Sequence, residues 1–264
     1  AAVLVIHGCG YGKAGPAGVI DDAHNSIAVR LARVGFLVLV PDRRGFGELQ
    51  PVKHYVWPSC SGDRYDARSL LEIDARESFS TDLRSLDVFD LLVAVDYLAS
   101  RDDVTSLGLA GLSGGGVVAI YVAGQNEDID AVALANALPF RHSISESRED
   151  EEPGATHEKY RALPETPLDW LRMRASGDLV PPLSILADDP ALVLLALLPP
   201  RPLLLEFGEL DTVSYVHGKN AAIGIVQQVY KRWRAPEQVS IVVEQGEHEF
   251  IVEPIIDFFQ EHLY

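Results

Sequence analysis

The five residues Gly111-Leu112-Ser113-Gly114-Gly115 place a serine between glycines, after an apolar segment and before a run of small residues. This Gly-x-Ser-x-Gly pattern is typical of a tight strand-to-helix turn that exposes the serine hydroxyl as a nucleophile. The residues two before and two after the serine must be small, because a Cβ there would collide with the turn. The pattern therefore predicts Ser113 as a nucleophile, with a plain Gly/Ser turn as the weaker interpretation.

A serine hydroxyl is a poor nucleophile at neutral pH and needs a base. Of the eight histidines, His248 fits best, because it follows the last predicted strand and precedes the last predicted helix. By contrast, His262 lies inside that helix and His217 begins another one. We expect His248 to be the base, and the alternative is a structural loop histidine.

A carboxylate should orient the base. The predicted strand 131–135 ends in Asn136, which has no carboxylate, whereas Glu209 and Asp211 follow the predicted strand 203–207. We expect Asp211 to fill this role. Glu209 is the substitute if the loop turns differently, and a turn or helix-capping aspartate is the structural alternative for Asp211.

The oxygen that becomes negative during attack on a carbonyl needs backbone N–H donors. The amide of Gly114 is one candidate, and the amide of Cys9 in the loop His7-Gly8-Cys9-Gly10 is the other. In this interpretation His7 supports the loop and is not a base, while the alternative is a simple Gly-rich turn.

The chain has two cysteines, Cys9 and Cys60. A single bridge between them stays open, and free thiols are the simpler expectation.

Short apolar segments alternate with helical patterns along the chain, which predicts a mostly parallel sheet with helices on both faces. Because the carboxyl ends of parallel strands meet at one edge, where open α/β sheets bind ligands, the candidate residues should gather there. The predicted strands are 2–6, 36–40, 104–110, 131–135, 203–207 and 239–243. The predicted helices are 22–34, 79–98, 114–123, 217–233 and 253–263.

The length of 264 residues suits a single catalytic domain over 1–264. The alternation breaks between 138 and 200, a charge-rich stretch with several prolines, which predicts an insert or lid within the domain. A second polar stretch runs from 50 to 76. We expect these two stretches to form the substrate pockets.

Composition and motifs disfavour several classes of partner. The net charge of −17 disfavours nucleic acid and anionic membranes. The chain contains no Walker-type loop, no His-Glu-x-x-His and no other metal-ligand spacing. We therefore expect no cofactor and no metal. The charged turn 42–48 is expected to pin loops by ion pairs, through Asp42, Arg43 and Arg44, in preference to touching substrate.

Taken together, these motifs resemble the α/β-hydrolase superfamily, and more narrowly its dienelactone hydrolase-like and acetyl xylan esterase-like branch. The matching segments occur in the expected order: 7–12, 41–48, 111–116, 200–204, 208–211 and 246–248. The resemblance implies hydrolysis of a small-molecule carboxylic ester through Ser113, Asp211 and His248, by way of an acyl-enzyme and without a cofactor. It suggests small acyl groups, such as acetyl esters of carbohydrates.

This chain departs from the family pattern in two ways. Dienelactone hydrolases proper carry a cysteine nucleophile, so Ser113 disfavours dienelactone as the substrate. The chain also begins at the third strand of the family's sheet, with the insert between the sixth and seventh family strands. Without the first two family strands the sheet would have an exposed edge, so we expect a fragment.

Two other functions stay open at this point. A serine peptidase of the prolyl-oligopeptidase kind shares the fold and the triad, and a non-catalytic binding protein could keep the fold alone. Because the chain starts without Met or a leader, the N-terminus does not set the compartment. A cytoplasmic location is favoured, and homo-oligomer formation stays open.

Overall fold

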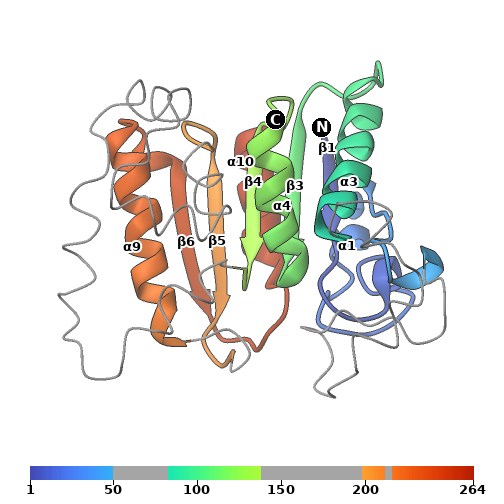
Figure 1. The fold of residues 1–264 in the computed structure, drawn as a ribbon, viewed down its shortest axis with the longest axis horizontal. Coiled ribbons are helices and arrows are strands. Elements are labelled where there is room, and N and C mark those ends of the chain that lie inside the picture. Colours follow the sequence, from blue (N-terminus) through green and yellow to red (C-terminus); the bar gives the residue numbers. More distant parts are fainter. Residues whose placement is uncertain (50–82, 138–197, 212–215) are drawn as a thin grey trace, which may run out of the picture.

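The structure, a computed structural model, describes residues 1–49, 83–137, 198–211 and 216–264. Within these residues, six strands form one sheet in the order β2-β1-β3-β4-β5-β6, and every pairing is parallel (Figure 1). The strands are β1 (Ala2–Ile6), β2 (Leu37–Leu39), β3 (Leu107–Leu112), β4 (Ala131–Ala135), β5 (Leu203–Gly208) and β6 (Val239–Glu244). This is the α/β-hydrolase fold predicted from the sequence.

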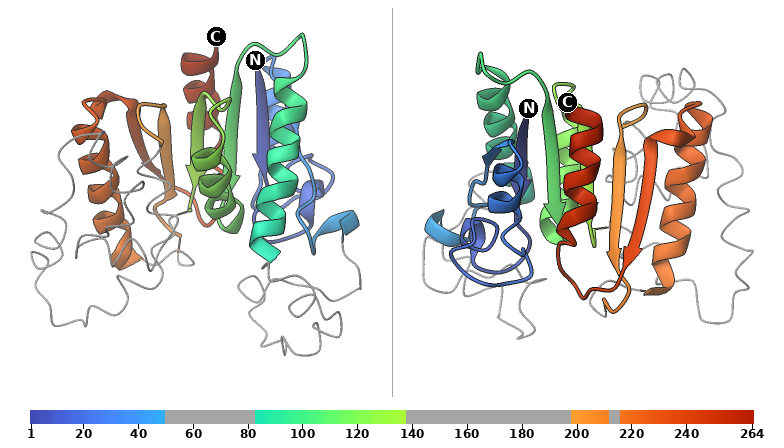
Figure 2. Two further views of the ribbon diagram at one scale, coloured as in Figure 1. Left: turned by 45° about the horizontal axis from the view of Figure 1, so that its top comes forward. Right: turned by 180° about the vertical axis from the view of Figure 1, so that it is seen from behind.

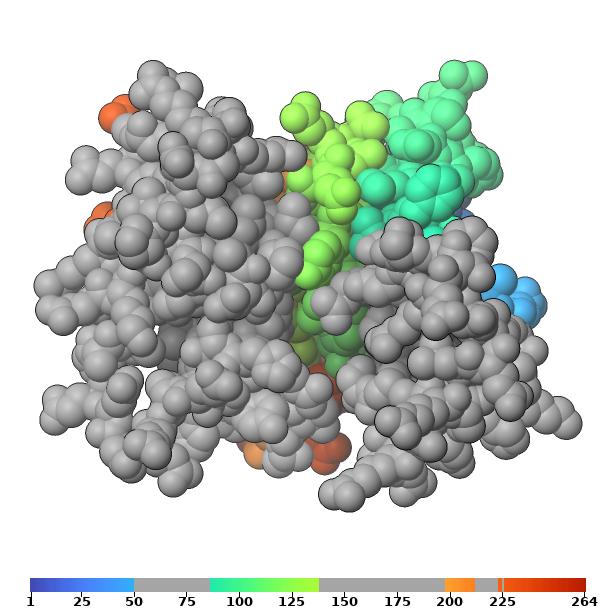
Figure 3. Space-filling model, in the orientation of Figure 1, coloured from blue at the N-terminus to red at the C-terminus, as the bar shows by residue number. Residues whose placement is uncertain are grey.

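Helices cover both faces of the sheet (Figure 2). They are α1 (Ile27–Arg33), α3 (Leu83–Ala99), α4 (Gly114–Gln125), α9 (Val216–Arg232) and α10 (Val252–Leu263), with single 3₁₀ turns at Gly12–Ala14, Gly47–Leu49 and Pro236–Gln238. Buried residues of α3, α4 and α9 join one hydrophobic cluster, and those of α1 and α10 join another. The surfaces of α3 and α4 adjoin in the space-filling view (Figure 3).

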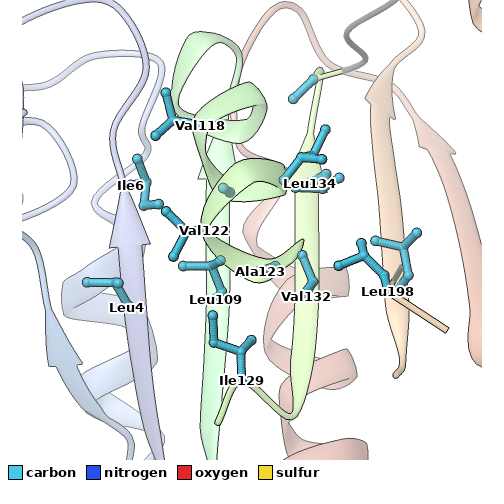
Figure 4. Packing of buried hydrophobic residues seen from close by; sticks show 14 of the residues in the cluster. Leu4, Ile6, Leu109, Val118, Val122, Ala123, Ile129, Val132, Leu134 and Leu198 are labelled. Carbon is cyan, nitrogen blue, oxygen red and sulfur yellow. The ribbon is translucent and has the colours of Figure 1, made fainter. Parts of the chain in front are cut away.

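The period-two alternation of the strands decides which side chains enter each layer. On β1, Leu4 and Ile6 belong to the cluster under α3 and α4, whereas Val3 and Val5 belong to the cluster under α10. Figure 4 shows the first cluster, where side chains of α4 interleave with those of β1, β3 and β4. Burying one such aliphatic side chain stabilises the fold by about 1.5–3 kcal/mol.

One expectation about the helices needs correction. The helix expected from 22 begins at Ile27, because Asn25 and Ser26 have φ of 49° and 51° and interrupt the helical backbone. The described part of the helix expected over 79–98 is α3, which starts at Leu83 in the described residues. Its inner face carries Val88, Leu91, Val95 and Leu98, whereas Phe89, Val93 and Tyr97 are exposed.

Several expectations fall outside the described residues. The polar stretch 50–76 is among them, and so is the predicted insert 138–200 apart from its last three residues. Both predictions therefore stay predictions. The described strands nonetheless direct the candidate residues to one edge of the sheet, because Ser113 follows β3, Asp211 follows β5 and His248 follows β6.

Candidate active site

Ser113 occupies a strained turn between β3 and α4. Its backbone has φ 54° and ψ −123°, a conformation that side-chain-bearing residues rarely adopt. A Cβ on Gly111 would lie 2.6 Å from Cα of Gly116, and one on Gly115 would lie 2.3 Å from the carbonyl oxygen of His7. The glycines flanking the serine are thus required by close backbone approach, as the motif predicted.

His248 and Asp211 meet although they follow different strands. Nδ1 of His248 lies 3.0 Å from Oδ2 of Asp211. The Asp211 side chain is fully buried and that of His248 is 21% exposed. Because an ionised carboxylate only accepts hydrogen bonds, Nδ1 carries the proton and Nε2 is the basic nitrogen. The alternative acid, Glu209, is exposed, and the carboxylate beside His248 is that of Asp211.

Backbone hydrogen bonds hold the loop after β5 against the loop after β6. The amide of Glu209 donates to the carbonyl of Glu244 at 2.8 Å, and the amide of Leu210 donates to the carbonyl of Gly246 at 2.9 Å. These bonds leave Asp211 and His248 little freedom to separate. The pairing of acid and base is therefore built into the backbone as well as the side chains.

The end of β4 connects Ser113 to the loops that carry His248 and Asp211. The amide of Ser113 donates to the carbonyl of Ala135 at 2.9 Å. The next residue, Asn136, donates its side-chain NH₂ to the carbonyl of Glu249 at 2.9 Å and accepts from the amide of Gly208 at 3.1 Å. The Ala135–Asn136 dipeptide thus connects the nucleophile turn, the acid loop and the base loop.

The sequence predicted only that Asn136 is not the acid, because its side chain has no carboxylate. It is 5% exposed and has φ 47°, a left-handed conformation that asparagine tolerates better than most residues. An asparagine at the carboxyl end of a strand, on the edge that carries the site, is the signal that could have revealed it.

The loop with Cys9 lies directly against Ser113. A Cβ built on Gly8 would be 2.9 Å from the carbonyl oxygen of Leu112 and 3.4 Å from Cβ of Ser113. Gly114 begins α4, so its amide belongs to the first turn, whose N–H groups lack helical partners. Both candidate oxyanion donors thus belong to segments that adjoin the serine.

Cys9 is disulfide-bonded, so the expectation of a free thiol is wrong at this position. Cysteine spacing could not predict this bond, because bridging depends on how distant segments approach. Cys60 lies outside the described residues.

His7 is fully buried, and its contacts fit a supporting role. Its Nδ1 lies 2.8 Å from the carbonyl oxygen of Gly8, and its Nε2 accepts the amide of Arg43 at 3.0 Å. Burial lowers the pKa of His7 to about 4, with the nearby Arg43 adding to the effect. The imidazole is therefore neutral at ordinary pH and donates at one nitrogen while accepting at the other.

The charged turn 42–48 after β2 holds neighbouring segments in place through hydrogen bonds and ion pairs, as predicted. The carboxylate of Asp42 accepts the amides of Lys13 and Glu48 at 2.7 and 3.0 Å. In the same turn, Arg43 pairs with the buried Asp87 of α3, and Arg44 binds Asp90 through two nitrogens. Burial raises the pKa of Asp87, and the guanidinium of Arg43 opposes that rise.

A further buried carboxyl, that of Glu206, contacts the segment that follows His248 and was not predicted from the sequence. Glu206 of β5 is fully buried, and its Oε2 accepts the amide of Ile251 at 3.2 Å. Burial raises the pKa of Glu206 to about 8, with Glu249 and Glu244 adding to the rise. The group is therefore largely protonated at neutral pH.

The described part of the chain contains no cluster of His, Cys, Asp and Glu side chains suited to a metal ion. Within the same residues, no helix has the length and apolar character needed to span a membrane.

Residues 2–156 match the dienelactone hydrolase family, which is more than half of the 264 residues. The chain therefore belongs to the dienelactone hydrolase family. This membership places it among esterase-type hydrolases, since a lactone is an internal carboxylic ester.

Solved structures of esterases share the fold. Esterase Pf2001 of Pyrococcus furiosus is 18% identical, with a TM-score of 0.55 over 100% of this chain and 83% of that one. An acetyl xylan esterase from Paenibacillus sp. R4 is 16% identical, with a TM-score of 0.57 over 99% and 74%. Methylesterase BT1017 is 19% identical, with a TM-score of 0.59 over 98% of this chain but 48% of its own. No curated protein sequence matches the chain.

Proposed function

We propose that the protein hydrolyses carboxylic esters through a covalent acyl-enzyme on Ser113. In this proposal His248 is the general base, Asp211 orients it, and the amides of Cys9 and Gly114 bind the oxyanion. The observation that carries the proposal is the 3.0 Å contact between His248 and Asp211 at the sheet edge where the strained Ser113 turn also ends. Membership of the dienelactone hydrolase family supports the ester as substrate.

Each step has a named group. Oγ of Ser113 bonds to the ester carbonyl carbon while Nε2 of His248 takes its proton and the carbonyl electron pair moves onto oxygen. When this oxyanion collapses, the alcohol leaves with the proton that His248 returns. A water molecule, deprotonated by the same nitrogen, then attacks the acyl-enzyme, and a second collapse releases the acid and restores Ser113.

The carboxylate of Asp211 has two effects in this scheme. It holds the imidazole with the proton on Nδ1, and its negative charge stabilises the imidazolium formed in each attack. The full burial of the Asp211 side chain supports the second effect, because charges interact more strongly where water is excluded.

As substrates we propose esters with small acyl groups, with acetyl esters of carbohydrates as the leading class. The support is the resemblance to the acetyl xylan esterase branch and the similar fold of the Paenibacillus acetyl xylan esterase. Ser113 in place of a cysteine further disfavours dienelactone as the substrate.

The test combines substrates with a covalent probe. We expect hydrolysis of p-nitrophenyl acetate and release of acetate from acetylated xylan, but no cleavage of an aminoacyl-proline anilide. A fluorophosphonate probe should label the wild type and not Ser113→Ala, whose circular dichroism should match that of the wild type. Cleavage of the anilide alone would favour a peptidase, and a folded wild type that resists labelling would favour a binding protein.

A further inference from the structure

A second histidine–carboxylate contact lies behind the loop of Cys9. Nδ1 of His24 is 2.8 Å from Oδ1 of Asp22. The His24 side chain is fully buried and the Asp22 side chain is 15% exposed. Because the carboxylate is an acceptor, Nδ1 of His24 carries the proton, and its Nε2 is left as an acceptor.

This Nε2 accepts the amide of Gly8 at 2.9 Å. The carbonyl of His7, on the other side of the same peptide unit, accepts Nη1 of Arg43 at 3.2 Å. Both polar groups of the peptide between His7 and Gly8 are therefore held by buried side chains. A planar peptide held at both its N–H and its C=O has a fixed orientation.

The next peptide unit contains the amide of Cys9. Its carbonyl, that of Gly8, is hydrogen-bonded to Nδ1 of His7 at 2.8 Å. In a trans peptide the N–H points away from the C=O, so this bond directs the Cys9 amide away from His7. Two buried histidines thus hold Gly8 from its two sides, while Gly8 itself adjoins Ser113.

Asp22 selects the tautomer of His24 that this arrangement needs. Its Oδ1 accepts both the side-chain Nδ1 and the backbone amide of His24, the latter at 2.9 Å. With the proton on Nε2 instead, the imidazole would present a donor to the Gly8 amide, which is also a donor. Burial lowers the pKa of His24 and so disfavours the doubly protonated imidazole, which would have no acceptor for the amide of Gly8.

We propose that His24, oriented by Asp22, is a positioning residue for the oxyanion hole, acting through Gly8 on the amide of Cys9. The inference rests on the proposed function, since it assigns Cys9 to oxyanion binding. Such a role differs from that of the Asp211–His248 pair, because the His24 side chain is fully buried and its Nε2 accepts the amide of Gly8. Donors held in advance where the oxyanion forms stabilise the transition state more than the ground state.

His24→Leu and His24→Gln form the central comparison. Leucine removes the acceptor for Gly8, whereas the glutamine amide oxygen can restore it near the place of Nε2. In His24→Leu we expect kcat for p-nitrophenyl acetate to fall about 10–100-fold with little change in KM. The inhibition constant of phenylboronic acid, which forms a tetrahedral adduct on serine, should rise in proportion. His24→Gln should recover most of both losses, and His262→Gln on α10 is the matched control.

Variants of Asp22 provide an independent test of the same role. Asp22→Asn keeps the Oδ1 acceptor, and its NH₂ takes the place of Oδ2, a buried atom that has no hydrogen-bond partner among the described residues. We expect Asp22→Asn to stay within about threefold of wild-type kcat, while Asp22→Ala should lose kcat as His24→Leu does. Asp21→Ala, at an exposed neighbouring position, controls for the loss of charge.

Folding is checked for each variant by near-UV circular dichroism. Folded His24→Leu with wild-type kcat overturns the inference, and so does a loss of kcat that leaves boronate inhibition unchanged. If His24→Leu does not fold, folded Asp22→Ala with wild-type kcat overturns it in the same way. A wild type that neither hydrolyses esters nor reacts with the fluorophosphonate contradicts the proposed function instead, so the two failures are distinguishable.

Discussion

Nδ1 of His248 and Oδ2 of Asp211 lie 3.0 Å apart, although the residues are separated by 37 positions in the chain. Replacing Asp211 by Asn keeps the shape but presents an amide, which can favour the wrong tautomer of His248. We expect Asp211→Asn to lower kcat for p-nitrophenyl acetate by roughly a thousandfold or more, with a smaller effect on KM.

Glu209→Gln is the matched control for this change, because Glu209 is exposed in the same loop. Its kcat should stay within about threefold of the wild type, in line with an exposed group outside the hydrogen-bonded pair. A large loss in Glu209→Gln together with an active Asp211→Asn would reverse the assignment of the acid.

Asn136 should matter for both stability and turnover. Asn136→Gly keeps the left-handed backbone accessible but removes the amide that bonds Gly208 and Glu249. Because two largely buried backbone groups lose their partner, we expect the free energy of unfolding to fall by about 2 kcal/mol or more. We also expect kcat to fall about tenfold, since the acid and base loops lose a shared anchor.

Urea unfolding and steady-state kinetics measure these two effects. Asn126→Ala alters an exposed asparagine whose side chain accepts the neighbouring amide of Asp128, and it should change stability by about 0.5 kcal/mol at most. Equal losses in the two variants would show that Asn136 has no special role in joining the loops.

The sequence predicted those parts of the molecule that depend on local pattern. β1 and β4 have the predicted bounds, and Ser113, Asp211 and His248 follow the strands expected for them. The contacts that remained hidden are made between distant segments: Asn136 binds a carbonyl 113 positions away, and His24 binds the amide of Gly8. Residue types and spacing do not specify such contacts, since they depend on how loops meet in space.

The wrong start of α1 has the same origin. The helix expected from 22 begins at Ile27, because Asp22 and His24 form hydrogen bonds in a turn and the next two residues have positive φ. This turn depends on the contact of His24 with Gly8, which the local sequence does not specify.

Acid should destabilise the protein through His7. Its pKa is about 4 in the folded state, below the ordinary value of 6.5, so the folded state binds fewer protons than the unfolded state between these values. The contribution to stability is fully present above pH 6.5 and is lost as pH falls toward 4. The slope is about 1.4 kcal/mol per pH unit for one histidine, and His24 acts in the same direction.

Urea unfolding at pH 7, 6 and 5 measures this slope. His7→Asn keeps a donor near Nδ1 but cannot titrate, so it should be less stable at pH 7 and show a shallower decline toward pH 5. His262→Gln, the control, should retain the wild-type slope. A His7→Asn slope equal to that of the wild type would mean that His7 takes up its proton in the folded state as readily as in the unfolded one.

Glu206 should have the opposite pH dependence. Its pKa is about 8 in the folded state against an ordinary value of 4.5, so the folded state keeps a proton that the unfolded state loses between these values. The stability that this group contributes is fully present below pH 4.5, falls as pH rises toward 8, and is constant above pH 8.

Glu206→Gln stays neutral and keeps an acceptor for the amide of Ile251, so it should be more stable than the wild type at pH 9. The gain should reach at most about 5 kcal/mol and disappear near pH 4.5. Urea unfolding at both pH values measures the difference between variant and wild type, which separates Glu206 from the histidines. Glu244→Gln, an exposed change on the neighbouring strand β6, should show no such difference. A Glu206→Gln protein that gains nothing at pH 9 would mean that the buried carboxyl ionises without a folding penalty.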